Sequence, residues 1–284
     1  MDDDMVLTPG GPRHKDFVNI IEPGHELHLL GTGEFVKREI ATNNMTHFVK
    51  PPAGRAQYAV HGPHGGPTAQ PAPAPGALPS GWQTYGWWDS GDTPITYFST
   101  EWTVPPAPAT SFGQTIFLFN GIQNTGTNYG ILQPVLQWGV SAIGGGAYWA
   151  VASWYVASGG QAFHSNLVRV NSGTVLQGVM TQTGVSGANY SYDSTFQRIA
   201  STTLPVANIA PLHWANETLE CYGLTQCSDL PATTDTPMSQ IEIKIGTAHP
   251  ALHWTAVNAI TGCGQHTVIA SNANPGGDVQ LFYK

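Results

Sequence analysis

The chain has 284 residues, of which only 10% are charged, and its formal net charge is −8 at pH 7. This length suffices for one large all-β domain with extensions or for two domains. The 33 Gly and 22 Pro residues, with abundant Thr, Ser, Asn and aromatic residues, are typical of turn-rich β proteins and not of helical ones.

Charge is distributed unevenly along the chain. Six of the ten Lys and Arg residues fall within residues 1–55, whereas residues 81–284 carry ten acids and four bases. A nucleic-acid groove needs the opposite sign, and no apolar run approaches the ~20 residues that span a bilayer. We therefore expect neither a nucleic-acid nor a membrane partner.

The first residues, Met-Asp-Asp-Asp-Met-Val-Leu, contain neither a basic n-region nor an apolar h-region, so no secretory signal is visible. The protein stays inside the cell, leaves it by another route, or has been trimmed. Localisation is left open.

Residues 1–60 contain three short β-like runs, at 17–22, 26–30 and 35–40, separated by Pro-Gly and Gly-Thr-Gly turns. They predict a β-rich extension that is an accessory subdomain, a sheet extension or a segment resembling a pro-segment. Residues 61–81 are rich in Pro and Gly and predict a linker. His61 and His64 lie in it, but two ligands in a flexible tract favour a solvated linker over a metal site.

The main domain is predicted at residues 82–284. Strand-like runs separated by Gly, Pro, Asn or Ser occur at residues 97–104, 115–123, 130–139, 147–156, 167–170, 174–183, 189–192, 217–222, 240–245, 255–260, 267–270 and 279–283. With no helical pattern between them, they predict an all-β fold, a two-sheet antiparallel β-sandwich or jelly roll.

The run at residues 131–139 combines an apolar face with an amide-bearing face. Because side chains alternate along a strand, Gln133 and Gln137 share one face, and Leu132, Leu136 and Trp138 the other. Pro134 lacks a ladder donor and predicts an edge, a bulge or a local break beside Gln133.

Two other strands put aromatic and polar side chains on one face. In residues 147–156 one face carries Trp149, Ser153 and Tyr155, and in residues 214–222 one face carries Glu220 and Tyr222, among others. Such faces suit a concave cleft for an extended polypeptide or polysaccharide, or they pack between the sheets.

Cysteine and serine chemistry is weakly supported. Three cysteines exclude a dense disulfide framework, and metal-ligand spacing is absent. Cys227 with Cys263 is the most plausible disulfide, because Cys221 lies in a predicted strand; three reduced thiols are the alternative. No Gly-x-Ser-x-Gly elbow occurs.

Five motifs, in order, resemble the glutamic peptidases called eqolisins. They are Glu-Trp-Thr-Val-Pro (101–105), Asn-Gly-Ile-Gln (120–123), Ile-Leu-Gln (131–133), an aromatic strand around 149–155, and Ala-Asn-Glu-Thr-Leu-Glu-Cys-Tyr (215–222). Matched residue by residue, Gln133 falls on the family's catalytic Gln and Glu220 on its catalytic Glu. Glu217 is the nearest rival to Glu220, but strand parity puts the two on opposite faces.

The resemblance implies a concave sandwich of the concanavalin A-like lectin and glucanase type and an acid-acting endopeptidase without a cofactor or metal. Glu220 would take a proton from the attacking water and return it to the leaving amine. Gln133 would orient that water and donate to the developing oxyanion. The candidate substrate-binding residues are Gln123, Gln137, Trp149, Ser153, Tyr155 and Tyr222.

The chain departs from the family pattern in the cleft. Gln123 stands where the family has Asp, and Trp149 and Ser153 stand where its aromatic strand carries acids, which leaves substrate preference and acid optimum open. The alternative is a non-catalytic, lectin-like binder of glycan or peptide that uses Trp88, Trp149, Trp154 and Tyr155 as stacking surfaces. A glycoside hydrolase would need two carboxylates about 5–10 Å apart, and the cleft strands offer one clear candidate.

Overall fold

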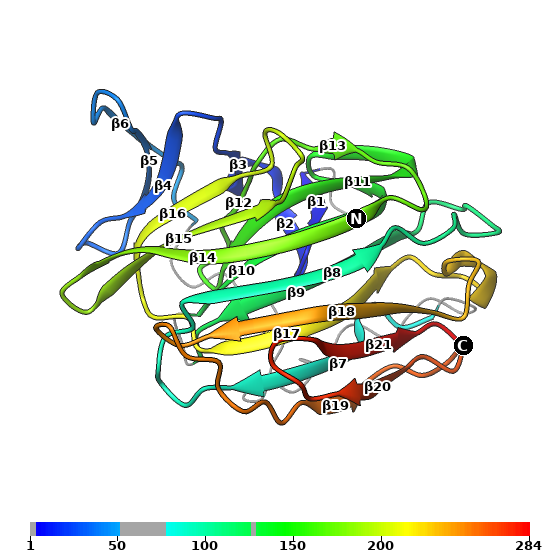
Figure 1. The fold of residues 1–284 in the computed structure, drawn as a ribbon. Helices are drawn as coiled ribbons and strands as arrows, with labels where there is room; N and C mark the ends of the chain where they lie inside the picture. Colours follow the sequence, from blue (N-terminus) through cyan, green and yellow to red (C-terminus); the bar gives the residue numbers. More distant parts are fainter. Residues whose placement is uncertain (1–3, 52–77, 126–128) are drawn as a thin grey trace.

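Two large β-sheets stacked face to face make up most of the protein (Figure 1). A computed structural model describes residues 4–51, 78–125 and 129–284. These residues form strands and loops, with two short 3-10 turns, η1 (Lys15–Phe17) and η2 (Cys227–Asp229). The β-sandwich expected from the density of strands is confirmed. In the described ranges, no helix is long and apolar enough for a membrane crossing.

Sheet A holds the site described below. In spatial order it consists of β19 (Thr255–Asn258), β7 (Gly81–Asp89), β17 (Trp214–Tyr222), β9 (Thr115–Gln123), β10 (Gly130–Ser141), β11 (Gly144–Ala157), β12 (Ala162–His164) and β3 (Val18–Ile20), with β13 (Val168–Arg169) beside β11.

Sheet B covers one face of sheet A. Its order is β20 (His266–Ser271), β21 (Gly277–Phe282), β18 (Asp235–Lys244), β8 (Tyr97–Thr103), β14 (Val175–Ser186), β15 (Asn189–Phe196), β16 (Leu204–Ile209), β4 (His25–Leu29), β5 (Phe35–Glu39) and β6 (Met45–His47). A separate two-stranded hairpin consists of β1 (Met5–Thr8) and β2 (Gly11–His14).

Both faces of sheet A are buried, because the two sets of alternating side chains pack into different apolar clusters. One set packs between the sheets with residues such as Trp102 and Met180. The other forms a second cluster on the outer face, with Trp82, Phe117, Phe119, Ile131, Val135, Ala152, Trp154, Val156, Ala162, Trp214 and Tyr222.

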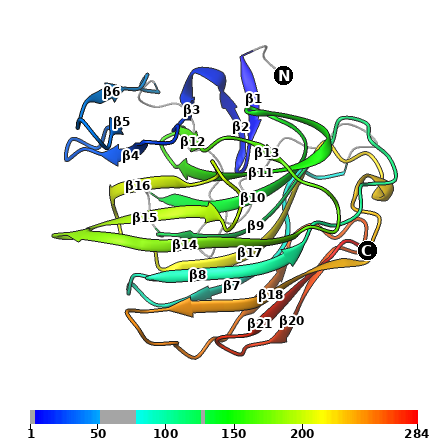
Figure 2. The same cartoon turned by 45° about the horizontal axis from the view of Figure 1, so that its top comes forward.

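The N-terminal strands join the sandwich through two parallel pairings. β3 lies parallel to β12, and β4 lies parallel to β16, so that β4, β5 and β6 extend sheet B at one corner (Figure 2). All other strand pairs are antiparallel among the described residues. His61 and His64 lie outside these residues.

Pro134 lies within an interior strand and not at an edge, because β9 and β11 flank β10 on both sides. Its ladder with β11 is continuous, with Pro134 opposite Ser153. Toward β9, however, the paired residues stop at Leu132 and resume at Val135. The expected local break is therefore present on one side, next to Gln133.

The disulfide between Cys227 and Cys263 is present, as predicted, and spans 36 residues. It ties η2 to the loop between β19 and β20. Cys221 is a free, buried thiol in β17. The alternative of three reduced thiols is thereby excluded.

Candidate active site

Gln133 and Glu220 lie on the same face of sheet A, as expected from the family resemblance. On β10 the neighbouring Ile131 and Val135 belong to the outer cluster, and on β17 Tyr222 does. Both side chains are almost completely buried, with exposures of 1% for Gln133 and 0% for Glu220. Glu217, three residues earlier in β17, lies on the opposite face, where it accepts a hydrogen bond from Thr100 of sheet B.

One carboxylate oxygen of Glu220 is fully engaged. Its Oε1 accepts hydrogen bonds from the Tyr222 hydroxyl at 2.5 Å and from the Gly10 backbone N–H at 2.9 Å. Oε2 has no donor with good hydrogen-bond geometry in the described part of the chain, although the Trp82 side chain lies close enough to stabilise the carboxylate. The carboxylate is thus held in orientation by one oxygen and presents the other for chemistry.

Burial raises the pKa of Glu220 to about 7. Hydrogen bonds from Tyr222 and Gly10, the positive charge of Arg13, and the Trp82 side chain partly oppose this by stabilising the carboxylate. A carboxyl group that is half ionised near neutral pH can both accept and return a proton, which is the property that a general acid–base catalyst needs.

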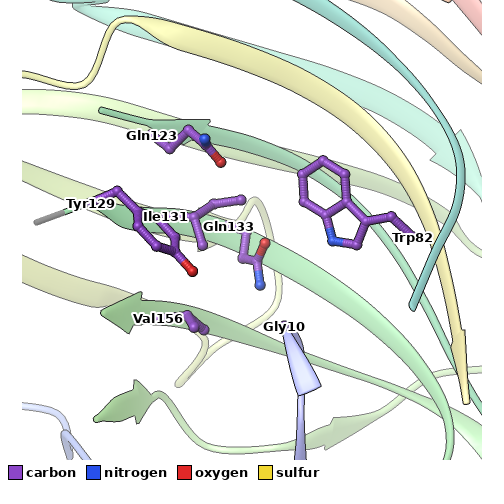
Figure 3. Close-up of a pocket in the computed structure, with 7 residues that line it drawn as sticks. All are labelled: Gly10, Trp82, Gln123, Tyr129, Ile131, Gln133 and Val156. Atoms are coloured by element: carbon purple, nitrogen blue, oxygen red, sulfur yellow. The ribbon is translucent and has the colours of Figure 1, made fainter. Parts of the chain in front are cut away.

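Gln133 borders a small cavity on the same face. The cavity measures about 10 Å³, close to the room that one water molecule needs, and is lined by Gly10, Trp82, Gln123, Tyr129, Ile131, Gln133 and Val156 (Figure 3). Gln133 Oε1 has no hydrogen-bond donor among the described residues. Gly10 borders this cavity and also contacts Glu220, so the two candidate catalytic side chains flank one region.

The strand register sets the two side chains at different levels of the sheet. The pairing of Leu132 with Ile122 brings Gln133 level with Gly121, whereas Glu220 pairs with Phe117. Four residues along β9 correspond to about 13 Å between these levels. The β17 residue at the level of Gly121 is Asn216, whose amide donates to the Gly121 carbonyl. No hydrogen bond joins Gln133 to Glu220 among the described residues.

Two further residues predicted to bind substrate lie at this site. Gln123 lines the same cavity as Gln133. Tyr222 donates its hydroxyl to Glu220. Gln137 lies on the same face of sheet A as Gln133, but its side-chain amide makes hydrogen bonds within the β10–β11 turn. Its amide donates to the Gly139 and Gly144 carbonyls and accepts from Ser141, which fixes the β10–β11 turn.

Trp149, Ser153 and Tyr155 face the layer between the sheets, and so do not share the face of Gln133. Trp149 packs edge-on against Trp138 at 5.4 Å, and Ser153 accepts a hydrogen bond from Ser194 of sheet B. The reason is register: Gln133 is directly opposite Trp154 in β11, so the even-numbered residues of that strand share its face.

Tyr155 lies at one end of this inter-sheet layer. Its ring packs edge-on against Phe35 of β5 at 5.7 Å, and burial raises its pKa. It lines a separate cavity of about 360 Å³ between the N-terminal strands and the sandwich. Trp88, assigned to the stacking surface of the lectin-like alternative, is also in the inter-sheet cluster, whereas Trp154 is on the outer face.

The structure adds site residues that sequence patterns did not select. Trp82 and Tyr129 line the cavity, and Gly10 reaches Glu220 from 210 residues away in the chain. Alternation within one strand carries no information about a distant segment that packs on it. The aromatic pattern of residues 82–88 was the one available signal for Trp82.

An aromatic row leads from the site along β7 and β17. Trp214 stacks with Trp82 at 6.4 Å and with Trp87 at 5.8 Å, and Tyr85 packs edge-on against Trp82. Trp87 and Tyr85 are partly exposed. This row offers flat apolar surface next to Glu220 for an extended ligand.

No group of three or more His, Cys, Asp or Glu side chains capable of holding a metal occurs in residues 4–51, 78–125 and 129–284.

No family model matches the sequence, and no curated protein matches it. Solved structures with a similar fold include scytalidoglutamic peptidase with a peptide-based transition-state analogue (12% identity, TM-score 0.42) and with a transition-state analogue inhibitor (12%, 0.45). A third is SCP-B, a member of the eqolisin family, with the tripeptide Ala-Ile-His (13%, 0.41). The matches cover 71–73% of this chain and 98–100% of the other chains.

SCP-B belongs to the family that the sequence motifs resemble. Because the identities are 12–13% and the TM-scores lie below 0.5, the function proposed next rests on this chain's own residues.

Proposed function

We propose that the outer face of sheet A hydrolyses peptide bonds, with Glu220 as general base and acid. The observation that carries this proposal is the state of Glu220: fully buried next to Trp82 and Gly10, which line the cavity, with Oε1 fixed by two donors and a pKa of about 7. The buried Glu217 of the same strand also has one oxygen without a described partner, but its other oxygen accepts from Thr100 alone, and its side chain faces sheet B and not the cavity.

In the proposed reaction, Glu220 Oε2 takes a proton from a water molecule as it attacks the scissile carbonyl, and gives that proton to the leaving amine. Tyr222 holds the carboxylate in orientation through Oε1. The Gln133 amide donates to the oxyanion that forms on the carbonyl oxygen. Both can act on one carbonyl only if their side chains converge over β9 when a peptide is bound. Otherwise Gln133 binds the substrate backbone further along the cleft.

The test uses the full chain and an unfolded protein substrate between pH 4 and pH 9. We expect Glu220→Gln to lower kcat at least 100-fold, because an amide cannot accept the proton. The matched control is Glu217→Gln, which changes a buried glutamate of the same strand on the opposite face and should keep activity within about threefold. Retained cleavage in Glu220→Gln would end the assignment.

Gln133→Ala separates the two roles for the amide. A loss in kcat of about 100-fold supports oxyanion stabilisation, whereas a raised KM with unchanged kcat supports backbone binding alone.

The pH dependence of cleavage follows from the ionisation of Glu220. Because the pKa of Glu220 is about 7, the fraction of its carboxylate form grows as pH rises through 7. We therefore expect kcat/KM to rise between pH 6 and pH 8, in contrast to the acid optimum that the family resemblance implies.

A non-catalytic binder is the second candidate. It is favoured by the offset of about 13 Å between the levels of Gln133 and Glu220, and by the aromatic row from Trp82 to Trp87. If wild-type protein is inert at every pH, binding of unfolded peptide or of glycan should weaken in Trp87→Ala. Unchanged binding in that variant contradicts the binder.

A further inference from the structure

The β1–β2 hairpin (residues 5–14) ends at the proposed site. Its tip is Pro9–Gly10, and the Gly10 N–H donates to Glu220 Oε1 at 2.9 Å. A side-chain carbon added at Gly10 would lie 3.4 Å from Val156 of β11, and one added at Gly11 would lie 3.7 Å from the Tyr222 hydroxyl. The tip therefore lies against β11 and against β17, the strand that carries Glu220.

The tip also occupies the space that the proposed substrate would need. Gly10 lines the cavity next to Gln133 (Figure 3). Its N–H also donates to Glu220. A backbone N–H of this chain thus takes the carboxylate oxygen, at a place between the two candidate catalytic side chains. With the tip seated, the remaining cavity of about 10 Å³ is far too small for a peptide.

Three sets of contacts hold the hairpin in this position. Outside, the Ala142 N–H in the β10–β11 turn donates to the Leu7 carbonyl at 2.7 Å, and Leu7 packs against the outer cluster. Inside, the fully buried Arg13 donates to the Thr8 hydroxyl at 2.8 Å, which keeps the tip folded. At the open end, Lys15 pairs with Asp4 at 2.6 Å on the surface.

We propose that residues 5–14 are a built-in plug of the peptide site, and that they must swing away before a polypeptide can reach Glu220. This rests on the proposed function of that site. The strand that follows the plug stays in place, because β3 is paired with β12 and Phe17 is buried. The moving part is the hairpin alone, and opening needs no cut in the chain.

Ala142→Pro tests the plug with little effect on the sandwich. Ala142 is the second residue of a turn, Ser141 to Gly144, where neither Ala142 nor Ile143 has positive φ and proline is well tolerated. The substitution removes the N–H that holds Leu7. Ala142→Ser, which keeps the N–H at the same place, is the matched control.

Opening is measured without reference to activity by placing a cysteine under the plug. In Val156→Cys the new thiol lies beneath Gly10, and its labelling by a maleimide reports opening. We expect Ala142→Pro to speed this labelling about fivefold or more, as expected for loss of a hydrogen bond, and Ala142→Ser to leave it unchanged. The native Cys221, buried on the other face of sheet A, must stay unlabelled, which excludes unfolding.

Gly10→Pro is a second way to loosen the plug, because proline has no N–H for Glu220 and cannot adopt the φ of +81° found at Gly10. Faster labelling in this variant or in Ala142→Pro, with Cys221 protected, supports the plug. Equal labelling rates in all variants overturn it.

Measurements of kcat/KM then test the plug proposal and the peptidase proposal independently of each other. With Val156 intact, we expect kcat/KM on unfolded protein to rise about fivefold or more in Ala142→Pro. Faster labelling with no cleavage in any variant keeps the plug and ends the peptidase proposal. If wild type cleaves the substrate and kcat/KM is unchanged in Ala142→Pro and Gly10→Pro, the peptidase proposal stands and the plug proposal is wrong.

Discussion

Glu220 differs from an ordinary buried acid in that its ionisation is balanced near neutrality. Burial raises its pKa from the usual 4.5 to about 7. Because the folded-state pKa is raised, the stabilisation associated with the neutral form is fully present below pH 4.5 and is lost as pH rises through 7. The proposed catalytic residue should therefore make the fold less stable in the pH range where it acts.

Glu220→Gln should remove this dependence. A shift of about 2.5 pKa units corresponds to about 3 kcal/mol, so the variant should gain up to about 3 kcal/mol over wild type at pH 8 relative to pH 4. Urea unfolding of both proteins at the two pH values measures this difference. An identical pH dependence in the two proteins would contradict the raised pKa.

Glu217 is buried between the sheets, where burial raises its pKa well above the usual value, and its partner is the Thr100 hydroxyl. In Glu217→Ala that hydroxyl loses its acceptor, and we expect a loss of about 1–3 kcal/mol in unfolding free energy. Glu217→Gln keeps an acceptor and avoids a buried charge, so it should be more stable than Glu217→Ala at every pH, as urea unfolding would report. Equal stabilities would show that the Thr100 contact contributes nothing.

At the scale of the elements, alternation in β10, β11 and β17 was predicted from the sequence, because each strand separates its side chains into two sets. The opposite faces of Glu217 and Glu220 follow from it, whereas the shared face of Gln133 and Glu220 was expected from the family resemblance. Which set of β11 faces the site could not be predicted, since both faces of sheet A are buried and both sets contain Trp or Tyr. Only the pairing of Gln133 with Trp154 shows that the set of β11 side chains containing Trp154 shares the face of Gln133.

The face assignment of β11 can be tested with a matched pair. Trp149→Phe, between the sheets, should lower the unfolding free energy by about 1–3 kcal/mol and leave KM for an unfolded protein substrate within twofold. Trp154→Phe, on the outer face, should have a similar effect on stability but raise KM. Urea unfolding and steady-state kinetics measure both quantities, and a KM effect confined to Trp149→Phe would reverse the assignment.

For the whole molecule, the density of strand-like runs was sufficient to predict a sandwich, but not how residues 4–51 join it. The parallel pairings of β3 and β4 depend on strands far along the chain, and short polar strands carry little periodic signal. The contact of Gly10 with Glu220 was inaccessible for the same reason. Cysteine count and strand placement, in contrast, made Cys227–Cys263 the most plausible pair, but they left three reduced thiols as an alternative that the structure excludes.

This disulfide closes a loop of 36 residues between η2 and the turn before β20. In the chain-entropy view such a loop contributes about 3–4 kcal/mol, so Cys227→Ser with Cys263→Ser should lower the unfolding free energy by that amount. Cys221→Ala is the control for loss of a thiol. In urea unfolding, reductant should destabilise wild type and leave the double variant unaffected. If reductant destabilises both proteins equally, the loss of unfolding free energy does not come from this disulfide.

The distance in sequence between the plug and its acceptor has a consequence for synthesis. Gly10 and Glu220 are 210 residues apart, so at about 5–20 residues per second some 10–40 s pass between their emergence from the ribosome. The first hairpin to be made has no carboxylate to bind until β17 is complete. On a growing chain, therefore, the contact between Gly10 and Glu220 cannot cover the outer face of sheet A until β17 has been made.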